Sequence, residues 1–430
     1  MRTRLYGRVL IDESECDNKI HINFNGVIKM VILKKTYKFR AYPSKEQKAI
    51  LNRQMLLCKE LYNHLLEKAK EHFKDTGKTF TKYDMIKWVT KFKKEHPEYN
   101  GVYSQVLQNV PDRLSKAYKN FFRRAKEKRG GKNVKVGFPR FRNFVSSLTY
   151  PQSGFKIERK RIGLSKVGMI NFVNHREIEG KIKTLSVKET KSGEWYVTIS
   201  VEKEDIVPFT NGKEAVGIDL GITNYAALSD GKVLQNKDVS NKERKTLRRL
   251  QKSISRRKKG SKNRKKSAFR FARYSEHISR IREDNLHKLS YYLVHSYSFI
   301  AYEELRIANM VRNRHLAKSI SESSWGNFAQ MLQYKAESAG CVAVGVNPQN
   351  TSKTCSECGN VQEMPLSERT FNCGKCGLNI DRDLNASKNI LKRATSGQGG
   401  SHASGDSASA PQKESASRIV ESGTTLGVSR

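Results

Sequence analysis

Apolar residues recur at helical spacing in two stretches of the first third of the chain. Residues 50–65 place their apolar side chains on one broad face, and Ser44 with Gln47 fits a capping box at the start of that helix. A second block of this kind covers about 104–128, with basic residues on its outer positions. We therefore predict that this part of the chain is helical.

Strand patterns lie on both sides of the helical region. One strand is predicted from Met30 up to the Pro-Ser pair that precedes the first helix. The alternating segments 183–189 and 195–202 are joined by the sequence TKSGE, which is typical of a β-hairpin turn. The pattern predicts a strand-rich module interrupted by a helical insert.

The second half of the chain predicts strands and helices in a different order. Residues 216–234 read as two strands around a Gly-containing turn, and the basic stretch 242–284 reads as helices that are split near Gly260. Residues 287–304 begin as a helix and end as a buried strand. Glu303 therefore lies at the carboxyl end of a strand, which is where ligands gather in open α/β sheets.

The two ends of the chain differ from the rest. Residues 1–29 look unlike the segment that begins at Met30, and we expect them to be a non-native or disordered extension. Residues 396–430 are rich in Gly, Ser and Ala and contain few large apolar side chains. This composition predicts a disordered tail.

The chain is long and strongly basic. Its 430 residues predict two or three domains, and 82 Lys and Arg against 42 Asp and Glu give a formal charge of +40. Nucleic acid is the partner that fits best, although a ribosomal or chromatin-type binder would share this composition. In 242–284 the charge density favours a surface that tracks phosphates over a merely solvated face.

The sequence also bears on location. No run approaches the roughly 18 consecutive apolar residues of a membrane span. The N-terminus lacks the apolar core of a signal peptide. We therefore expect a cytoplasmic, nucleoid-associated protein.

Four of the seven cysteines form two close pairs. Cys355 and Cys358 are separated from Cys373 and Cys376 by 14 residues, and a glycine follows each pair. Four thiolates at this spacing predict one structural Zn²⁺, because they leave no open position for a catalytic water.

Three carboxylates are placed where burial would be costly without a cation. Asp219 interrupts an apolar strand, Glu303 ends another, and Asp383 precedes a helix after the last cysteine pair. Three carboxylates on separate elements can hold two metal ions about 4 Å apart for phosphodiester hydrolysis, and such oxygen ligands favour Mg²⁺ or Mn²⁺. From the residues alone, Asp219 could instead be a turn residue or a helix cap. Glu304 could be the ligand in place of Glu303, and Asp381 in place of Asp383.

The order of these motifs resembles the TnpB family, the accessory proteins of a bacterial insertion-sequence family and relatives of type V CRISPR nucleases. The resemblance covers roughly 30–395 and is carried by the following segments: YKFRAYPSKEQ, SQVLQ, GFPRFR, GIDLGITNYAAL, YEELRIANM, SWGNFAQMLQYKAESAG, NTSKTCSECG, FNCGKCG and DRDLNASKNIL. The family usually has Glu-Asp-Leu where this chain has Glu303-Glu304-Leu305. This departure leaves Glu303 intact.

The resemblance implies an α+β multidomain fold and a two-metal nuclease site. A β-barrel wedge domain with a helical recognition insert would be followed by a ribonuclease-H-type, RuvC-like nuclease domain with an inserted zinc ribbon. Mapped onto this chain, the wedge domain covers 30–43 and 136–207, the insert 44–135, the nuclease 208–349 and 379–395, and the ribbon 350–378. Asp219, Glu303 and Asp383 are then the catalytic residues and the Mg²⁺ ligands.

The resemblance also implies the partners. They are a guide RNA from the transposon end, a double-stranded target DNA read through that RNA next to a short flanking motif, and a separate transposase that joins strands. The predicted nucleic-acid contacts are Lys35, Arg40, Tyr42, Arg123, Arg124, Arg140, Phe141 and Arg142. Two alternatives are a guided repressor that does not cut, and a ribonuclease or junction-resolving enzyme, which would not explain the insert or the ribbon.

Overall fold

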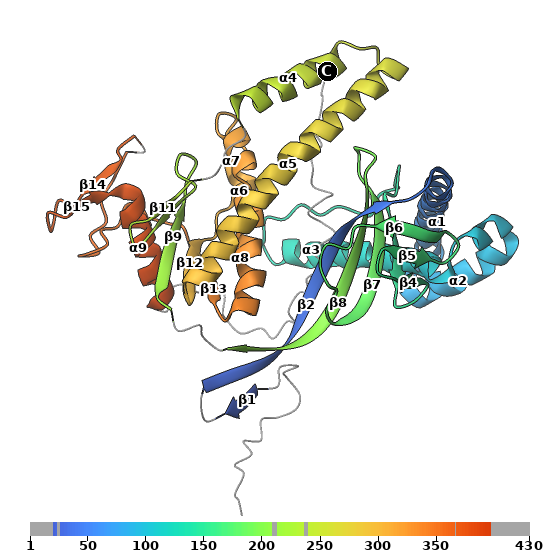
Figure 1. The fold of residues 1–430 in the computed structure, drawn as a ribbon, viewed down its shortest axis with the longest axis horizontal. Coiled ribbons are helices and arrows are strands. Elements are labelled where there is room, and N and C mark those ends of the chain that lie inside the picture. The colour runs from blue at the N-terminus through green and yellow to red at the C-terminus, as the bar shows by residue number, and fades with distance from the viewer. Residues whose placement is uncertain (1–19, 24–25, 209–212, 236–239, 366, 397–430) are drawn as a thin grey trace, which may run out of the picture. The chain divides into compact units, whose positions relative to one another are not determined.

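The computed structural model describes residues 20–23, 26–208, 213–235, 240–365 and 367–396, which form two compact units (Figure 1). One unit is Leu33–Lys203, and the other combines the described residues before Leu33 with those from Glu204 onward. The finer domain boundaries expected from the sequence stay predictions. In the described part of the chain, no helix is both long and apolar enough to cross a membrane.

The first unit combines a barrel-like sheet with helices. Its sheet has the strand order β3-β7-β8-β2-β6-β5-β4, and neighbouring strands pair antiparallel from β3 to β8 and from β2 to β4. The strands are β2 (Gly26–Tyr42), β3 (Ser147–Pro151), β4 (Phe155–Ile157), β5 (Arg161–Leu164), β6 (Gly168–Phe172), β7 (Lys181–Glu189) and β8 (Trp195–Pro208). The pairing of β7 with β8 confirms the hairpin predicted from the alternating pattern.

The apolar spacing predicts two helices of this unit, α1 (Lys45–Thr76) and α3 (Ser104–Arg129), and the structure adds α2 (Lys82–Glu95) and the 3₁₀ helix η1 (Pro97–Gly101) between them. The capping box is confirmed, because Gln47 N donates to Ser44 Oγ (3.1 Å) and Ser44 N donates to Gln47 Oε1 (3.0 Å). Gly77 ends α1 at φ 67°, a left-handed conformation that favours glycine. One core, containing Phe39, Leu61 and Leu114, joins these helices to the sheet.

The ends of the chain depart in part from expectation. Residues 20–23 form β1 (Ile20–Asn23), which pairs with residues 26–29 at the start of β2, where disorder was expected. The rest of the predicted extension, 1–19 and 24–25, and the predicted tail from 397 lie outside the described residues.

The second unit is built on a five-stranded sheet with the order β11-β10-β9-β12-β13. β9, β12 and β13 are parallel, and β10 runs antiparallel to both of its neighbours. The strands are β9 (Ala215–Leu220), β10 (Ala226–Leu228), β11 (Val233–Leu234), β12 (Phe299–Glu303) and β13 (Val342–Val346), and a separate hairpin pairs β14 (Thr370–Asn372) with β15 (Asn379–Asp381).

Helices cover both faces of this sheet (Figure 1). The helices of this unit are α4 (Asn241–Ser255), α5 (Lys262–Ser296), α6 (Ile307–Met310), α7 (Ala317–Ser323), α8 (Trp325–Ala339) and α9 (Arg382–Thr395), of which α5 and α8 pack on one face of the sheet and α9 on the other. Ile218 packs with Leu293 and Phe328 of α5 and α8, whereas Ala301 packs with Ile390 of α9 on the opposite face. The predicted break in the basic helices is confirmed, since α4 ends and α5 begins around Gly260.

Candidate functional site

Two of the predicted carboxylates lie on neighbouring parallel strands. Tyr302 of β12 pairs with Ile218 of β9, so continuing that register by one residue sets Glu303 beside Asp219. Side chains on adjacent strands are about 4.8 Å apart. Because side chains alternate along a strand, both carboxylates share the sheet face that α9 covers, the face of Gly217 and Ala301.

The third carboxylate, Asp383, lies in the first turn of α9. That helix rests directly on β9, because a Cβ atom at Gly217 would lie 2.0 Å from the carbonyl oxygen of Ser387 and 2.9 Å from Leu391 N. The close approach is possible only where the strand has no side chain. It brings the first turn of α9 to the edge of the sheet where Asp219 and Glu303 lie.

The electrostatics of the site reflect this convergence. Burial, together with the negative charges of Glu303 and Asp383, raises the pKa of Asp219 to about 8, although Arg382 lowers it. Burial also raises the pKa of Glu303, which the hydrogen bond from Thr351 lowers. Buried carboxylates close together cannot all ionise unless a cation is present. The arrangement is therefore suited to binding positive charge.

The structure distinguishes the candidate ligands from the acidic residues beside them. The side chain of Asp381 accepts from Asp383 N (2.9 Å) and Leu384 N (3.0 Å), so it serves as the N-cap of α9. Glu304 is exposed and lies over Gly345, on the sheet face opposite to Glu303. These positions favour Asp383 over Asp381, and Glu303 over Glu304, as metal ligands.

The carboxylates are not gathered around a single point. In the part of the chain that the structure describes, they do not form a cluster of three or more side chains placed to hold one ion. Arg382 Nε instead lies 3.3 Å from Asp383 Oδ1, and Thr351 Oγ1 donates to Glu303 Oε1 (2.5 Å).

The four cysteines do form such a cluster. Cys355, Cys358, Cys373 and Cys376 have their sulfur atoms within 4.8 Å of one another. Gly359 (φ 72°) and Gly377 (φ 76°) turn the two loops the same way, and their amides donate to the carbonyl oxygens of Cys355 (3.1 Å) and Cys373 (3.0 Å). Four converging sulfur atoms with no open position are compatible with a structural Zn²⁺.

The predicted nucleic-acid contacts divide into exposed residues and residues that have partners within the fold. Tyr42 (56% exposed) and Phe141 (52%) present their rings to solvent. Arg40 pairs with Glu194, and Arg142 lies over the ring of Tyr62. Lys35 is half-buried, Arg123 pairs with Glu127 (2.5 Å), and Arg124 and Arg140 are exposed.

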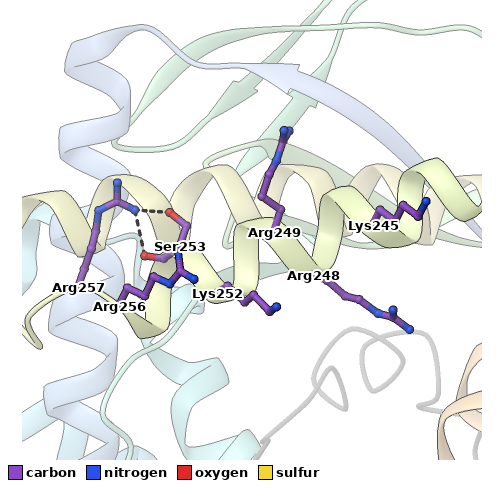
Figure 2. A pocket seen from close by; sticks show the side chains of 7 residues that line it. All are labelled: Lys245, Arg248, Arg249, Lys252, Ser253, Arg256 and Arg257. Atoms are coloured by element: carbon purple, nitrogen blue, oxygen red, sulfur yellow. Dashed lines mark hydrogen bonds between the residues drawn. The ribbon is translucent and has the colours of Figure 1, made fainter.

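A larger basic surface lies on α4. A pocket of about 590 Å³ is lined by Lys245, Arg248, Arg249, Lys252, Ser253, Arg256 and Arg257. Figure 2 shows these side chains along the helix. Within the described residues, the side chains of the first four cations and of Arg256 have no hydrogen-bond or ion-pair partner, whereas the side chain of Arg257 donates to Ser253 and Ser267. The spacing of these cations aligns them along one side of a helix. We call this row, Lys245 to Arg256, the α4 basic row.

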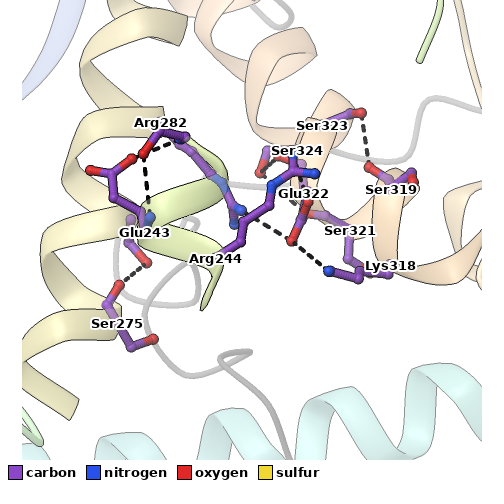
Figure 3. Close-up of polar contacts among 12 residues, drawn as sticks. Glu243, Arg244, Ser275, Arg282, Lys318, Ser319, Ser321, Glu322, Ser323 and Ser324 are labelled. Carbon is purple, nitrogen blue, oxygen red and sulfur yellow. Dashed lines mark hydrogen bonds and ion pairs between the residues drawn. The ribbon is translucent and has the colours of Figure 1, made fainter. Parts of the chain in front are cut away.

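The helix that carries the α4 basic row is anchored at its base. Glu322 of α7 pairs with Arg244 of α4 (3.3 Å), Arg282 of α5 (3.3 Å) and Lys318 (3.9 Å), as Figure 3 shows. At the other end, Arg264 Nη1 donates to the carbonyl oxygens of Ile254 (2.9 Å) and Arg257 (3.0 Å). These interactions fix α4 to α5 and α7, so the row is presented on a supported surface.

Sequence reasoning named no individual residue of the α4 basic row, and it missed Gly217 and Thr351. The density of charge in 242–284 pointed to the row, but only helical geometry selects which cations share one side. Gly217 and Thr351 stand inside motifs that were noted for their acids and cysteines. No sequence signal distinguishes Thr351 from the other hydroxyl residues around it.

Comparisons with known families cover most of the chain. The family model described as "Probable transposase" matches 198–314, a "Helix-turn-helix domain" matches 30–78, and a "Cas12f1-like, TNB domain" matches 325–390. In this chain 30–78 contains part of β2, the single long helix α1 and its cap.

Two relatives are similar over most of this chain and most of their own length. "Putative RNA-guided DNA endonuclease InsQ" of Escherichia coli K12 is 31% identical over 83% of this chain and 91% of that protein. A protein described as "Putative RNA-guided DNA endonuclease" from Streptomyces pristinaespiralis is 32% identical over 84% and 89%. The solved "Cas12f1-sgRNA-target DNA complex" has a similar fold, with a TM-score of 0.54 and 14% identity over 84% of this chain and 99% of that one.

Proposed function

This chain belongs to the TnpB family of RNA-guided DNA endonucleases encoded by insertion sequences, and from that premise we propose that it cuts DNA with Asp219, Glu303 and Asp383 as the ligands of two divalent metal ions. The expected α+β multidomain fold agrees with this membership. The observation that best supports the catalytic assignment is the convergence of these three carboxylates from β9, β12 and α9.

The chemistry follows from the residues of the site. When bound, two Mg²⁺ or Mn²⁺ ions activate a water and stabilise the leaving oxygen of a phosphodiester. Asp219 is the central group, since the charges of both other carboxylates raise its pKa, and it must lose its proton to act as a ligand.

We propose that the partners are a guide RNA from the transposon end and a double-stranded target next to a short flanking motif. A separate transposase joins strands, and the protein acts in the bacterial cytoplasm at the nucleoid. The test is co-expression with the RNA-encoding end of the element, followed by a challenge with guide-matched plasmids that carry a randomised flank and Mg²⁺. Cutting that ignores the RNA would contradict the proposal, and guided binding without cutting would favour a repressor.

Zinc in the cysteine cluster should be required for the active fold. We expect Cys373→Ser to lower bound zinc from about one ion per chain and to reduce cleavage by at least tenfold, because metal-binding free energy is folding free energy at such sites. Zinc content is measured by elemental analysis alongside cleavage. Cys341→Ser is the matched control. Cys341 is buried and does not belong to the cysteine cluster, so this variant should bind as much zinc as the wild type. Full zinc content in Cys373→Ser would contradict the assignment.

The α4 basic row is the surface that we propose to contact nucleic-acid phosphates. Replacing Lys245, Arg248, Arg249 and Lys252 by Ala should weaken binding and reduce the slope of log affinity against log salt by about one for each phosphate that is no longer neutralised. Binding is measured between low and high salt. A charge-conserving variant with Lys and Arg exchanged at the same positions is the control. An unchanged slope in the alanine variant would remove the row from the interface.

The raised pKa of Asp219 predicts a pH dependence. Its folded pKa of about 8 exceeds the ordinary value of 3.8, so protonation stabilises the metal-free fold, and this contribution is lost as pH rises through about 8. Metal binding must displace that proton. The apparent Mn²⁺ affinity should therefore rise about tenfold per pH unit from 6 to 8 and level off above. Mn²⁺ titrations across this range provide the measurement, and a flat profile would contradict it.

A further inference from the structure

The loop from Asn347 to Ser356 connects the two candidate metal sites of the second unit. It leaves β13 at Val346 and enters the first cysteine loop at Cys355. Along its course it contacts both a catalytic carboxylate and the helix that carries another. The residues that make these contacts are Thr351 of the loop and Asn385 and Asn389 of α9.

The first contact is made by Thr351, which is buried (3% exposed). Its hydroxyl donates to Glu303 Oε1 at 2.5 Å, and it also lies 3.1 Å from the carbonyl oxygen of Pro348. The single hydroxyl proton goes to the nearer acceptor, the carboxyl oxygen of Glu303. This bond holds one carboxylate oxygen of Glu303 and leaves the other for a cation.

The second set of contacts comes from two buried amides of α9. Asn389 Nδ2 donates to the carbonyl oxygens of Thr351 (2.9 Å) and Thr354 (2.6 Å). Asn385 Nδ2 donates to Thr354 O (2.8 Å), and its Oδ1 accepts from Ser356 N (2.9 Å). The helix that positions Asp383 therefore also holds the backbone of Thr351 and the start of the first cysteine loop.

We propose that Thr351 is a positioning residue that orients the carboxylate of Glu303 for the catalytic metal ions, and that Asn389 and Asn385 fix Thr351 to α9. The proposal rests on the two-metal nuclease function proposed above. Groups that hydrogen-bond to metal ligands commonly change metal affinity 10- to 100-fold when they are removed. The loop from Asn347 to Ser356, which leads into the cysteine cluster, would then also position a ligand of the catalytic metal ions.

A pair of substitutions at Thr351 separates orientation from folding. Thr351→Val keeps the β-branched shape and removes the hydroxyl, whereas Thr351→Ser keeps the hydroxyl. In the complete complex with guide RNA, we expect Thr351→Val to raise the half-saturating Mg²⁺ concentration for cleavage about tenfold. Thr351→Ser should restore it to within about threefold of the wild type.

The same pair is then compared in three measurements that do not depend on cleavage. Mn²⁺ binding, followed by electron paramagnetic resonance, should weaken by a similar factor in Thr351→Val alone. Zinc content and guided DNA binding should equal those of the wild type in both variants. A merely structural role would instead lower zinc content or DNA binding, and it would leave the metal dependence of the remaining active complex unchanged.

Asn389→Ala extends the test to the helix. It removes both bonds from this side chain of α9 to the loop, so Mn²⁺ affinity should fall as in Thr351→Val, whereas Lys388→Ala, on the adjacent half-buried position, should leave it unchanged. Wild-type metal dependence in Thr351→Val, or an equal defect in Thr351→Ser, would overturn the inference. A wild-type complex that cuts no guide-matched DNA would instead count against the proposed function itself.

Discussion

Asp219→Asn should abolish guided cleavage while leaving the assembled protein intact. Asparagine keeps the size of the side chain but removes the central negative charge of the three carboxylates. Loss of several kcal/mol of transition-state stabilisation corresponds to a fall in rate of about 10³-fold or more. The measurement is single-turnover cleavage of a guide-matched plasmid at saturating Mg²⁺.

Binding and stability provide the internal controls for this variant. Guided DNA binding should match that of the wild type, because Asp219 lies on the α9 side of the sheet, away from the α4 basic row. The metal-free variant should melt at the same or a higher temperature, since it no longer buries a carboxyl group whose ionisation is unfavourable. Residual cleavage above about a tenth of the wild-type rate would contradict the role of Asp219 as a metal ligand.

Gly217→Ala should have the second-largest effect, although residue 217 carries no functional group. Its Cβ would lie 2.0 Å from the carbonyl oxygen of Ser387, and this contact involves backbone on both sides. Neither atom can move without shifting β9 or α9. We expect the displacement of Asp383 to reduce cleavage at least about 100-fold, because a misplacement of about 1 Å can have that effect. Cleavage and melting temperature are the measurements.

Gly101→Ala is the control for the added methyl group, because no atom lies within 4 Å of a Cβ at that position. It should leave both cleavage and melting temperature near those of the wild type. Gly217→Ala should lower the melting temperature by several degrees, as overpacking of about 1–3 kcal/mol does. If Gly217→Ala melts and cuts like the wild type, α9 does not depend on this close approach.

Local sequence signals predict individual elements well in this chain. The capping box at Ser44, the hairpin around TKSGE and the break at Gly260 depend on residues close in sequence, and the structure confirms all three. The strand expected at 298–304 ends at Glu303, as predicted.

The acids of the candidate site show where local reasoning ends. The sequence identified Asp219 by the cost of burying a carboxylate in an apolar strand, but it did not separate Asp383 from Asp381. The structure assigns Asp381 to the N-cap of α9, which is a matter of backbone geometry. The resemblance to the TnpB family selects Asp383 as the metal ligand from the motif alone.

Most helices and strands, the basic character, the cysteine pairs and the family can be predicted from the chain alone, because they depend on composition, on periodicity and on the order of motifs. The fold is needed to show which acids are neighbours, which cations of α4 share one side, and that Thr351 contacts Glu303. The contacts among the acids and with Thr351 join residues far apart in the chain. Their positions depend on strand register and on the seating of α9 against Gly217, and no local pattern encodes either.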